Sequence, residues 1–246
     1  MNRRSTSSGP GPSRPLGWRA VPKPSGGTRR LVLLDPEDEL AFARVVVGIA
    51  PTIRRAFGAE SHANRFAGWD PRHGLLLEPW RQARQRWHGE LRRLGSRGRC
   101  GAVTDVRACY GSIPPGVVEH RLRVLGAPQD GIDEIGSWLR AFRDAGVDGL
   151  PVGPVASAVL ADIVLAAGDH ALRSTGASFA RWVDDVAIFA PDRRARAVAL
   201  DALRGAWTSL GLEMHEQKTV LLEDPRDMTA SAGTTSNAPS AASTLR

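Results

Sequence analysis

Three aspartates are the residues of this sequence best suited to chemistry. Asp105 ends a short apolar run, and Asp184 and Asp185 form the tip of a segment whose pattern predicts a β-hairpin. If these strands pair in one sheet, three carboxylates meet at its edge and repel one another unless a cation lies between them. Two Mg²⁺ ions about 4 Å apart can activate an attacking hydroxyl and stabilise the leaving oxygen in phosphoryl transfer. The pattern therefore suggests a two-metal site.

Each acid also has an ordinary interpretation. Aspartate is common in turns and at helix caps, so an Asp-Asp pair taken alone more often marks a solvated turn than a metal site. The choice between the two interpretations depends on the elements around the acids, because only a shared sheet would bring Asp105 to Asp184 and Asp185.

Hydrophobic periodicity and turn residues predict those elements. We expect two strands within 21–34 around a turn at 24–27, a strand at 101–106, a hairpin at 178–190, two short strands flanking Lys218, and helices at 36–47, 77–94, 117–125, 132–142, 155–172 and 193–210. Residues 58–75 contain several glycines and are expected to form a loop. This order predicts an α+β domain, with an antiparallel sheet and helices packed on one face of it.

Five short motifs occur in order between about Val21 and Leu222. They are Pro22-Lys23 with Gly26-Gly27 and Arg29; Asp105 with Tyr110 and Ser112-Ile113; Leu150-Pro151-Val152-Gly153-Pro154 with Ser157 and Leu160-Ala161; Trp182-Val183-Asp184-Asp185; and Gly211-Leu212 with Lys218-Thr219. Each is weak alone, but in this order and spacing they resemble the motifs of the reverse transcriptase family. The resemblance implies a palm domain with part of a fingers region.

The resemblance also suggests how the chain is divided. We expect a fingers-like region at residues 20–100 and a palm catalytic domain at residues 101–224. Residues 1–19 and 225–246 are rich in small and polar residues without apolar periodicity, so we expect disorder in both segments.

The resemblance implies an RNA-directed DNA polymerase that adds dNTPs to the 3′-hydroxyl of a DNA or RNA primer on an RNA template. Asp105 and Asp184 would hold two Mg²⁺ ions, for which Mn²⁺ could substitute. Asp185 would complete the site, and the backbone carbonyl of Val106 would add one ligand. Lys218 would bind the leaving pyrophosphate or protonate it, since the pKa of a lysine can be tuned for proton transfer.

The same resemblance assigns the nucleotide-binding residues. Lys23 and Arg29 would clamp the triphosphate, Tyr110 would exclude a ribose 2′-hydroxyl, and Val152 and Gly153 would lie beside the incoming nucleotide. The ordinary alternatives are exposed cations and a buried aromatic ring. Lys23 and Lys218 are the only lysines among 33 basic residues, which fits a chemical demand for lysine at these two places.

Three features depart from the family pattern. Trp182 replaces the usual Tyr or Phe, and Val152 replaces a common Gln. Gly153-Pro154 followed by Ser157 resembles the bacterial antiphage and abortive-infection branch, which would imply a role in phage defence. After Leu222 we find no primer-grip or thumb motif, so we expect a truncated member, or a partner protein or structured RNA that holds the duplex. A catalytically idle module that binds nucleic acid and a non-templated DNA-synthesising enzyme remain the alternatives.

Composition agrees with a polyanionic partner. The formal net charge is +7, the apolar fraction is 42%, and the two cysteines and scattered histidines suggest neither a disulfide framework nor a zinc site. No segment suggests a membrane span or a secretory signal, so we expect an intracellular, cytoplasmic protein without membrane contact.

Overall fold

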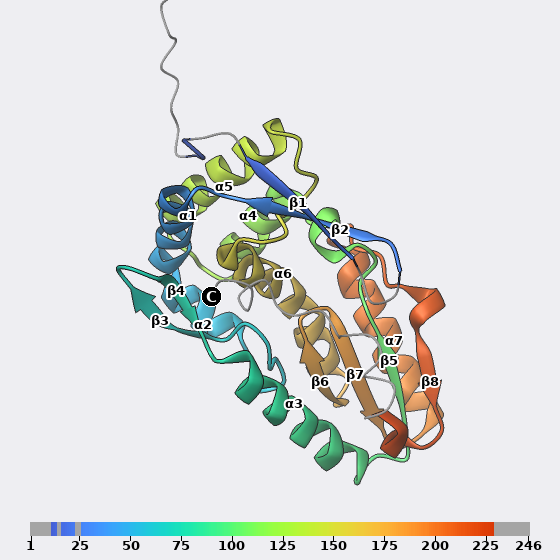
Figure 1. Cartoon of the computed structure of the whole chain (residues 1–246). Helices are drawn as coiled ribbons and strands as arrows, with labels where there is room; N and C mark the ends of the chain where they lie inside the picture. Colours follow the sequence, from blue (N-terminus) through green and yellow to red (C-terminus); the bar gives the residue numbers. More distant parts are fainter. Residues whose placement is uncertain (1–10, 14–15, 23–25, 229–246) are drawn as a thin grey trace, which may run out of the picture.

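A four-stranded antiparallel sheet lies at the centre of the half of the molecule that contains Asp105, Asp184 and Asp185. The computed structural model describes residues 11–13, 16–22 and 26–228 (Figure 1). The strands are β5 (Cys100–Thr104), β6 (Ser178–Trp182), β7 (Asp185–Ala190) and β8 (Val220–Leu222), in the order β6-β7-β5-β8. The sheet with its surrounding helices confirms the predicted α+β class.

Two hairpins lie outside this sheet. The first, β1 (Gly17–Pro22) with β2 (Thr28–Leu33), is the hairpin that the sequence predicted. It begins at Gly17, so the expectation of disorder through residue 19 is wrong for residues 17–19, where the guanidinium of Arg30 lies 3.4 Å from the ring centre of Trp18; residues 1–10 and 14–15 lie outside the described residues. The second, β3 (Phe66–Asp70) with β4 (Gly74–Leu77), contradicts the expected loop at 58–75. Its strands are short and rich in glycine, which hides a strand pattern.

The six predicted helices are present. The helices are α1 (Pro36–Gly48), α2 (Ala50–Ala56), α3 (Trp80–Gly95), α4 (Pro115–Val124), α5 (Gln129–Asp144), α6 (Val155–Ser174) and α7 (Arg193–Thr208). The side chain of Asp35 caps α1 by accepting a hydrogen bond from the backbone of Glu37. The sequence did not suggest α2, since seven residues are too few to display a helical period.

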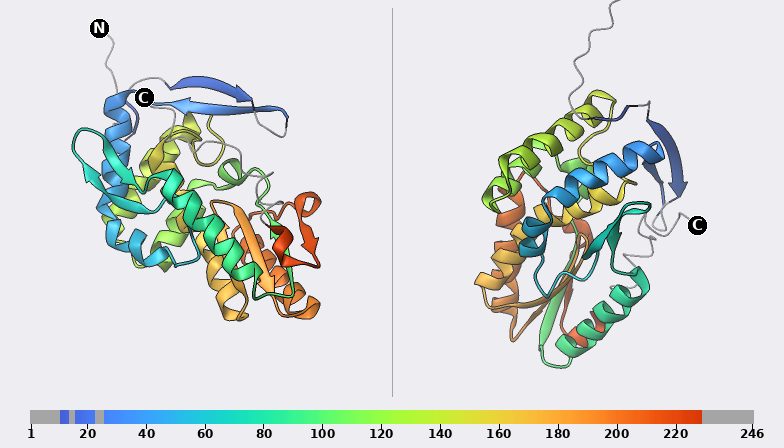
Figure 2. Two further views of the ribbon diagram at one scale, coloured as in Figure 1. Left: turned by 60° about the horizontal axis from the view of Figure 1, so that its bottom comes forward. Right: turned by 90° about the vertical axis from the view of Figure 1, so that its left-hand side faces the viewer.

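Helices cover both faces of the sheet, whereas we expected one. On one face α6 and α7 pack against Ala102, Val186 and Ile188. On the other face Trp87 and Leu91 of α3 pack against Val103 and Ala187. All of β7 is buried, and strands that are apolar on both sides need cover on both sides. In Figures 1 and 2 α3 crosses the sheet on the side opposite α7.

The environment of Lys218 also differs from the prediction. It ends a short 3₁₀ helix (Glu216–Lys218), and only β8 follows as a strand. Before it, the expected strand is a single antiparallel bridge between Met214 and Val106. One strand and one bridge therefore stand where we expected two strands.

The chain remains ordered beyond Leu222. Residues Pro225–Asp227 form a 3₁₀ turn, and the side chain of Met228 is completely buried beside Val103 and Leu91. The expectation of disorder from residue 225 is therefore wrong for 225–228, because a single apolar residue is enough to anchor the turn. Residues 229–246 lie outside the described residues.

Helix α6 passes the length and composition test for a membrane span, contrary to our expectation that no segment would. Its most apolar window has a mean hydropathy of 1.5, and 72% of that window is buried inside the protein. Its apolar side chains pack against α1, α4 and α7 in the main core, which accounts for its composition.

Candidate active site

The end of the central sheet brings the three aspartates together. Thr104 pairs with Val186 across β5 and β7, so Asp105 leaves the sheet next to the turn that carries Asp184 and Asp185. In that turn Trp182 pairs with Asp185, which leaves a loop of two residues, Val183 and Asp184. The sequence predicted this convergence from strands that had to pair, and the register of the sheet confirms it.

Burial and mutual repulsion shift the acids away from their ordinary ionisation. Asp105 and Asp185 are only 7% and 8% exposed. Burial, with a further contribution from Asp105, raises the pKa of Asp184 to about 6. Burial, together with Asp184 and Asp105, raises the pKa of Asp185 to about 8, although Arg84 on α3 opposes that shift. The three carboxylates therefore lie close enough to disfavour one another's charge.

Lys218 is the cation in direct contact with this cluster. Its Nζ lies 2.9 Å from Oδ2 of Asp105. The neighbouring Thr219 hydroxyl lies 2.8 Å from the hydroxyl of Thr104, and the backbone N–H of His215 donates to the carbonyl of Asp105 at 2.9 Å. These bonds attach the Lys218 turn to the end of β5, so the lysine and the aspartate face each other although 113 residues separate them.

A loop with two glycines at positive φ, Gly149 and Gly153, lies between Tyr110 and β2. The N–H of Leu150 donates to the carbonyl of Tyr110 at 2.8 Å, and Gly149, at φ +66, lies so close that a Cβ would be 2.2 Å from the same oxygen. The carbonyl of Val152 accepts from the N–H of Val32 in β2 at 2.7 Å. This contact joins the predicted fingers hairpin to the palm.

Gly153 makes that junction possible. Its φ is +139, and a Cβ there would lie 2.4 Å from the carbonyl oxygen of Val32. The structure thus gives Val152 and Gly153 a backbone contact with β2, which the sequence did not suggest. Their predicted place beside the incoming nucleotide stays a prediction.

Of the remaining predicted site residues, Arg29 and Tyr110 lie near the acids. The positive charge of Arg29 lowers the pKa of Asp184 and of the half-buried Tyr110. Burial acts in the opposite direction and raises the pKa of the Tyr110 hydroxyl well above its ordinary value. Both side chains therefore lie within electrostatic reach of Asp184. Lys23 lies outside the described residues.

The acids fit divalent cations that are completed by a substrate. Oδ1 of Asp105 is buried and has no hydrogen-bond partner, which leaves a hard oxygen ligand available. The backbone hydrogen bonds donated by the N–H groups of Arg107 and His215 lie on either side of the antiparallel bridge between Val106 and Met214. In such a pair the carbonyl of Val106 points away from Met214. Within the described residues, no group of three or more His, Cys, Asp and Glu side chains forms a preassembled metal cage. Mg²⁺ commonly binds one or two carboxylates and takes its other ligands from phosphates and water.

A comparison with models of protein families shows to which family the chain belongs. The model of the family described as reverse transcriptase (RNA-dependent DNA polymerase) matches residues 21–231. The chain belongs to the reverse transcriptase family. The family is one of nucleotidyltransferases, and the matched segment contains all five motifs. None of the curated proteins that were compared is similar enough to count as a match.

Solved structures similar to this reverse transcriptase family member include three yeast telomerases. A Candida albicans telomerase with a fragment of telomeric RNA has 13% identity and a TM-score of 0.54, with 83% of this chain and 41% of that chain covered. Two apo telomerases from Candida tropicalis, one truncated from its C-terminal domain, have 10% and 11% identity and TM-scores of 0.57 and 0.58. They cover 85% and 90% of this chain and 51% and 46% of their own. At these identities the likeness shows the fold alone, and the chain spans about half the length of these structures or less.

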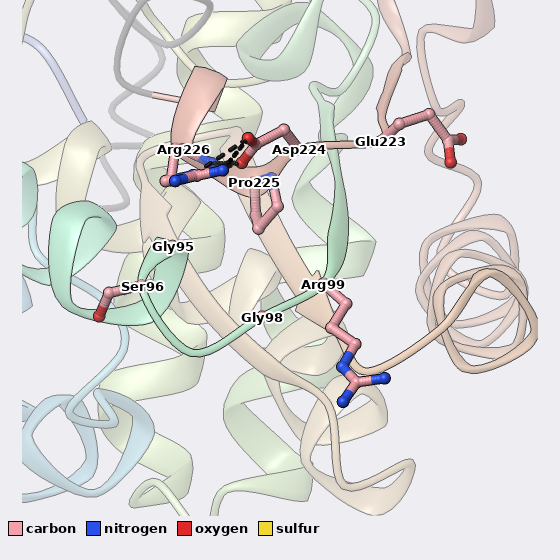
Figure 3. A pocket seen from close by; sticks show the side chains of 8 residues that line it. All are labelled: Gly95, Ser96, Gly98, Arg99, Glu223, Asp224, Pro225 and Arg226. Atoms are coloured by element: carbon pink, nitrogen blue, oxygen red, sulfur yellow. Dashed lines mark hydrogen bonds and ion pairs between the residues drawn. The ribbon is translucent and has the colours of Figure 1, made fainter.

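A surface pocket elsewhere on this reverse transcriptase family member is not the site. It measures about 430 Å³ and is lined by Gly95, Ser96, Gly98, Arg99, Glu223, Asp224, Pro225 and Arg226 (Figure 3). These residues lie before the start of β5 and after β8, at the opposite end of β5 from Asp105. In Figure 3 Arg226 is paired with Asp224, so the most prominent charges there neutralise one another.

Sequence reasoning missed two arginines beside the acids. Arg84 stacks between Trp87 and Trp182, 4.6 and 5.0 Å from their ring centres, and its charge opposes the raised pKa of Asp185. Arg181 is completely buried in β6, two residues before Val183. The available signal was a charged residue within an otherwise apolar strand, and we passed over it because arginine is abundant throughout the chain.

Proposed function

We propose that this chain is an RNA-directed DNA polymerase that transfers dNTPs to the 3′-hydroxyl of a primer with the help of two Mg²⁺ ions. The supporting observation is the meeting of Asp105, Asp184 and Asp185 at the end of a buried sheet, with pKa values of about 6 and 8 for Asp184 and Asp185. Carboxylates that are costly to ionise in the empty protein gain most from a divalent cation.

Asp105, Asp184 and Asp185, with the carbonyl of Val106, would hold the ions. Bound there, two divalent cations lower the pKa of the primer hydroxyl and stabilise the charge on the leaving oxygen. The primer oxygen attacks the α-phosphorus, the bond to the β-phosphate oxygen breaks, and pyrophosphate leaves. Mn²⁺ offers the same coordination and is expected to substitute.

The other residues act on the nucleotide itself. Arg29 would bind the triphosphate with its guanidinium fork, and Lys23 is proposed for the same task from its sequence motif. Lys218 has a half-exposed side chain, so its ammonium can turn from Asp105 to the pyrophosphate and donate a proton to it. The ring of Tyr110 would exclude a ribose 2′-hydroxyl, which selects deoxynucleotides.

The partners follow from the same proposal. An RNA template and a DNA or RNA primer would bind through a chain whose net charge is +7, and such binding weakens as salt rises. A partner protein or structured RNA would add further grip on the duplex. A role in bacterial phage defence rests on the Gly153-Pro154 motif with Ser157, and the genes beside this one are the observation that would test it.

Primer extension with purified protein tests the activity. Parent protein with Mg²⁺, an RNA template, a primer and dNTPs should extend the primer, and Asp184→Asn should reduce extension by a factor of about 10³ or more, because it removes a ligand charge without changing shape. Asp201→Asn, at an exposed aspartate of α7, is the matched control and should extend normally. Extension by Asp184→Asn at the parent rate would place the chemistry elsewhere.

Two further arms of this assay separate the alternatives. Omitting the template distinguishes templated from non-templated synthesis. Offering ribonucleotides to Tyr110→Val tests the sugar choice, since loss of the ring should admit them. A parent protein that binds primer–template without extending it would support the idle nucleic-acid-binding module.

A further inference from the structure

Arg181 is a fully buried cation clamped between two fully buried acids of the neighbouring helix α6. Its Nε and Nη2 donate to the two carboxylate oxygens of Asp169 at 2.7 and 2.8 Å, and its Nη1 donates to Asp162. All three residues are 0% exposed. Asn64, from the loop before β3, donates to the second oxygen of Asp162 at 2.9 Å. The guanidinium is therefore fixed from several sides.

The same guanidinium reaches the catalytic turn. Nη1 of Arg181 also donates to the backbone carbonyl of Val183 at 2.7 Å. Val183 has a φ of +55, a left-handed conformation that is costly for a β-branched side chain. Val183 directly precedes Asp184, so the dihedral angles of Val183 set the direction in which the Asp184 carboxylate projects.

We propose that Arg181 is a positioning residue of the active site: clamped by Asp162 and Asp169, it holds Val183 in its left-handed conformation and thereby aims Asp184 at the metal. This inference rests on the proposed function for its catalytic consequence. An ion pair that served folding alone would need only the bonds to Asp162 and Asp169. The further bond to a strained backbone carbonyl one residue from the acid is what assigns the second role.

The clamp also links the turn to the predicted fingers region. The backbone N–H of Arg181 donates to the carbonyl of Glu60 at 2.8 Å, and the N–H of His62 donates to the carbonyl of Arg181 at 3.0 Å. Together with the Asn64 bond, these contacts fix both the backbone and the side chain of Arg181 against residues 60–64. The turn is therefore held by a network that is complete before any substrate arrives.

Arg181→Lys is the central variant, because one ammonium keeps the charge but cannot reproduce the planar fork to Asp169 and the bond to Val183 together. Arg173→Lys is the matched control, since Arg173 makes a similar two-pronged pair with the side chain of Glu60 at the surface and does not bond the turn itself. We expect both variants to fold. For Arg181→Lys we expect kcat to fall on the order of tenfold or more with little change in the KM for dNTP.

The readout independent of activity is Mn²⁺ binding to the protein without nucleotide, followed by electron paramagnetic resonance. A displaced Asp184 should weaken Mn²⁺ binding on the order of tenfold in Arg181→Lys and leave Arg173→Lys unchanged. If Arg181→Lys does not fold, Asp162→Asn replaces it. That variant keeps the Asp169 fork and loosens only the anchor of Nη1, and it should shift Mn²⁺ binding in the same direction by a smaller factor.

A double-mutant cycle with Val183→Gly tests whether Arg181 acts through the turn. Glycine adopts positive φ without a steric penalty, so the turn should depend less on the Arg181 bond. Arg181→Lys should therefore reduce kcat and Mn²⁺ affinity by a smaller factor in the Val183→Gly background than in the parent. Equal factors in both backgrounds would overturn the proposed route through Val183.

The two proposals fail in different ways. Unchanged Mn²⁺ affinity and unchanged kcat in a folded Arg181→Lys, with an active parent, would overturn the positioning role alone. Absence of nucleotide incorporation by the parent would overturn the proposed function, while the Mn²⁺ measurement would still decide whether Arg181 positions Asp184.

Discussion

Two clusters of buried carboxylates lie on either side of one β-turn, and they are compensated in opposite ways. In the Arg181 cluster, Asp162 and Asp169 share a guanidinium that meets both of them with hydrogen bonds. At the sheet edge, Lys218 contacts Asp105 directly, and the other carboxylate oxygen of Asp105 has no hydrogen-bond partner among the described residues.

This difference indicates that the Arg181 cluster stabilises the fold, whereas the cluster at the sheet edge is suited to binding a cation. Burial is the largest cause that raises the pKa of Asp162 and of Asp185, but Arg181 opposes the shift of Asp162 from direct contact. Asp185 has only the more distant charges of Arg84 and Lys218 to oppose repulsion from two neighbouring carboxylates. Uncompensated charge at a functional site lowers stability in the empty protein and is repaid when the ligand binds.

The largest expected effect comes from removing the cation of the compensated cluster. Arg181→Met should leave two buried carboxylates without a partner and destabilise the fold by about 3–5 kcal/mol, which can prevent folding outright. Urea unfolding followed by tryptophan fluorescence measures it. Arg173→Met, at the exposed pair with Glu60, should cost less than about 1 kcal/mol. Equal losses in the two variants would mean that burial does not distinguish these pairs.

The opposite sign is expected at the sheet edge. Asp185→Asn removes a carboxyl whose ionisation burial, Asp184 and Asp105 all disfavour in the folded state, so at neutral pH the metal-free variant should be more stable than the parent. A gain of about 1 kcal/mol would raise Tm by about 2–4 °C in a protein of this size. The control Asp201→Asn lies at an exposed pair and should not raise Tm. A lower Tm for Asp185→Asn would show that the acids at the edge are already compensated.

Divalent cations should stabilise the parent more than Asp185→Asn, which is opposite to the order of stability expected without metal. A ligand that binds only the folded protein at tenfold excess over its Kd stabilises it by about 1.4 kcal/mol. Mg²⁺ or Mn²⁺ should therefore raise the Tm of the parent, measured by calorimetry, and should raise that of Asp185→Asn less. Equal shifts for both proteins would indicate metal binding outside the sheet edge.

The contrast between the clusters also explains what the sequence could and could not predict. Asp105, Asp184 and Asp185 end apolar strands, and strand pairing places them together whatever the side chains around them do. The Arg181 cluster joins a strand to a helix, and no local period records that pairing. Asp162 and Asp169 are seven residues apart, hence on one face of α6, and this could have drawn attention in a helix that is otherwise apolar.

Other misses have similar causes. That α3 packs on the second face of the sheet depends on the tertiary arrangement, although the fully apolar β7 indicated burial on both sides. The bond from Val32 to the carbonyl of Val152 uses backbone atoms, which sequence does not distinguish. The sequence motifs therefore identified the three acids and Lys218, whereas the contacts that hold these residues in place are seen only in the three-dimensional structure.

The smallest effect is expected at Glu39, a half-buried carboxylate outside both clusters whose compensation is intermediate. Its Oε1 accepts from the N–H of Val155 at the start of α6, at 3.1 Å. Burial raises the pKa of Glu39, and the Val155 bond opposes that shift only in part. A raised pKa in the folded state means that protonation of Glu39 favours folding, and this contribution is lost as pH rises through the folded pKa.

Glu39→Gln keeps an oxygen for Val155 and cannot ionise. The stability of the variant relative to the parent should therefore improve as pH rises above the ordinary glutamate value of about 4.3, by up to about 1 kcal/mol near pH 7. Urea unfolding at several pH values measures this difference, with the exposed Glu134→Gln of α5 as the control for loss of a surface charge. A relative stability of Glu39→Gln that falls with rising pH would mean that the Val155 N–H compensates the Glu39 charge fully, which would place Glu39 with the Arg181 cluster rather than between the two.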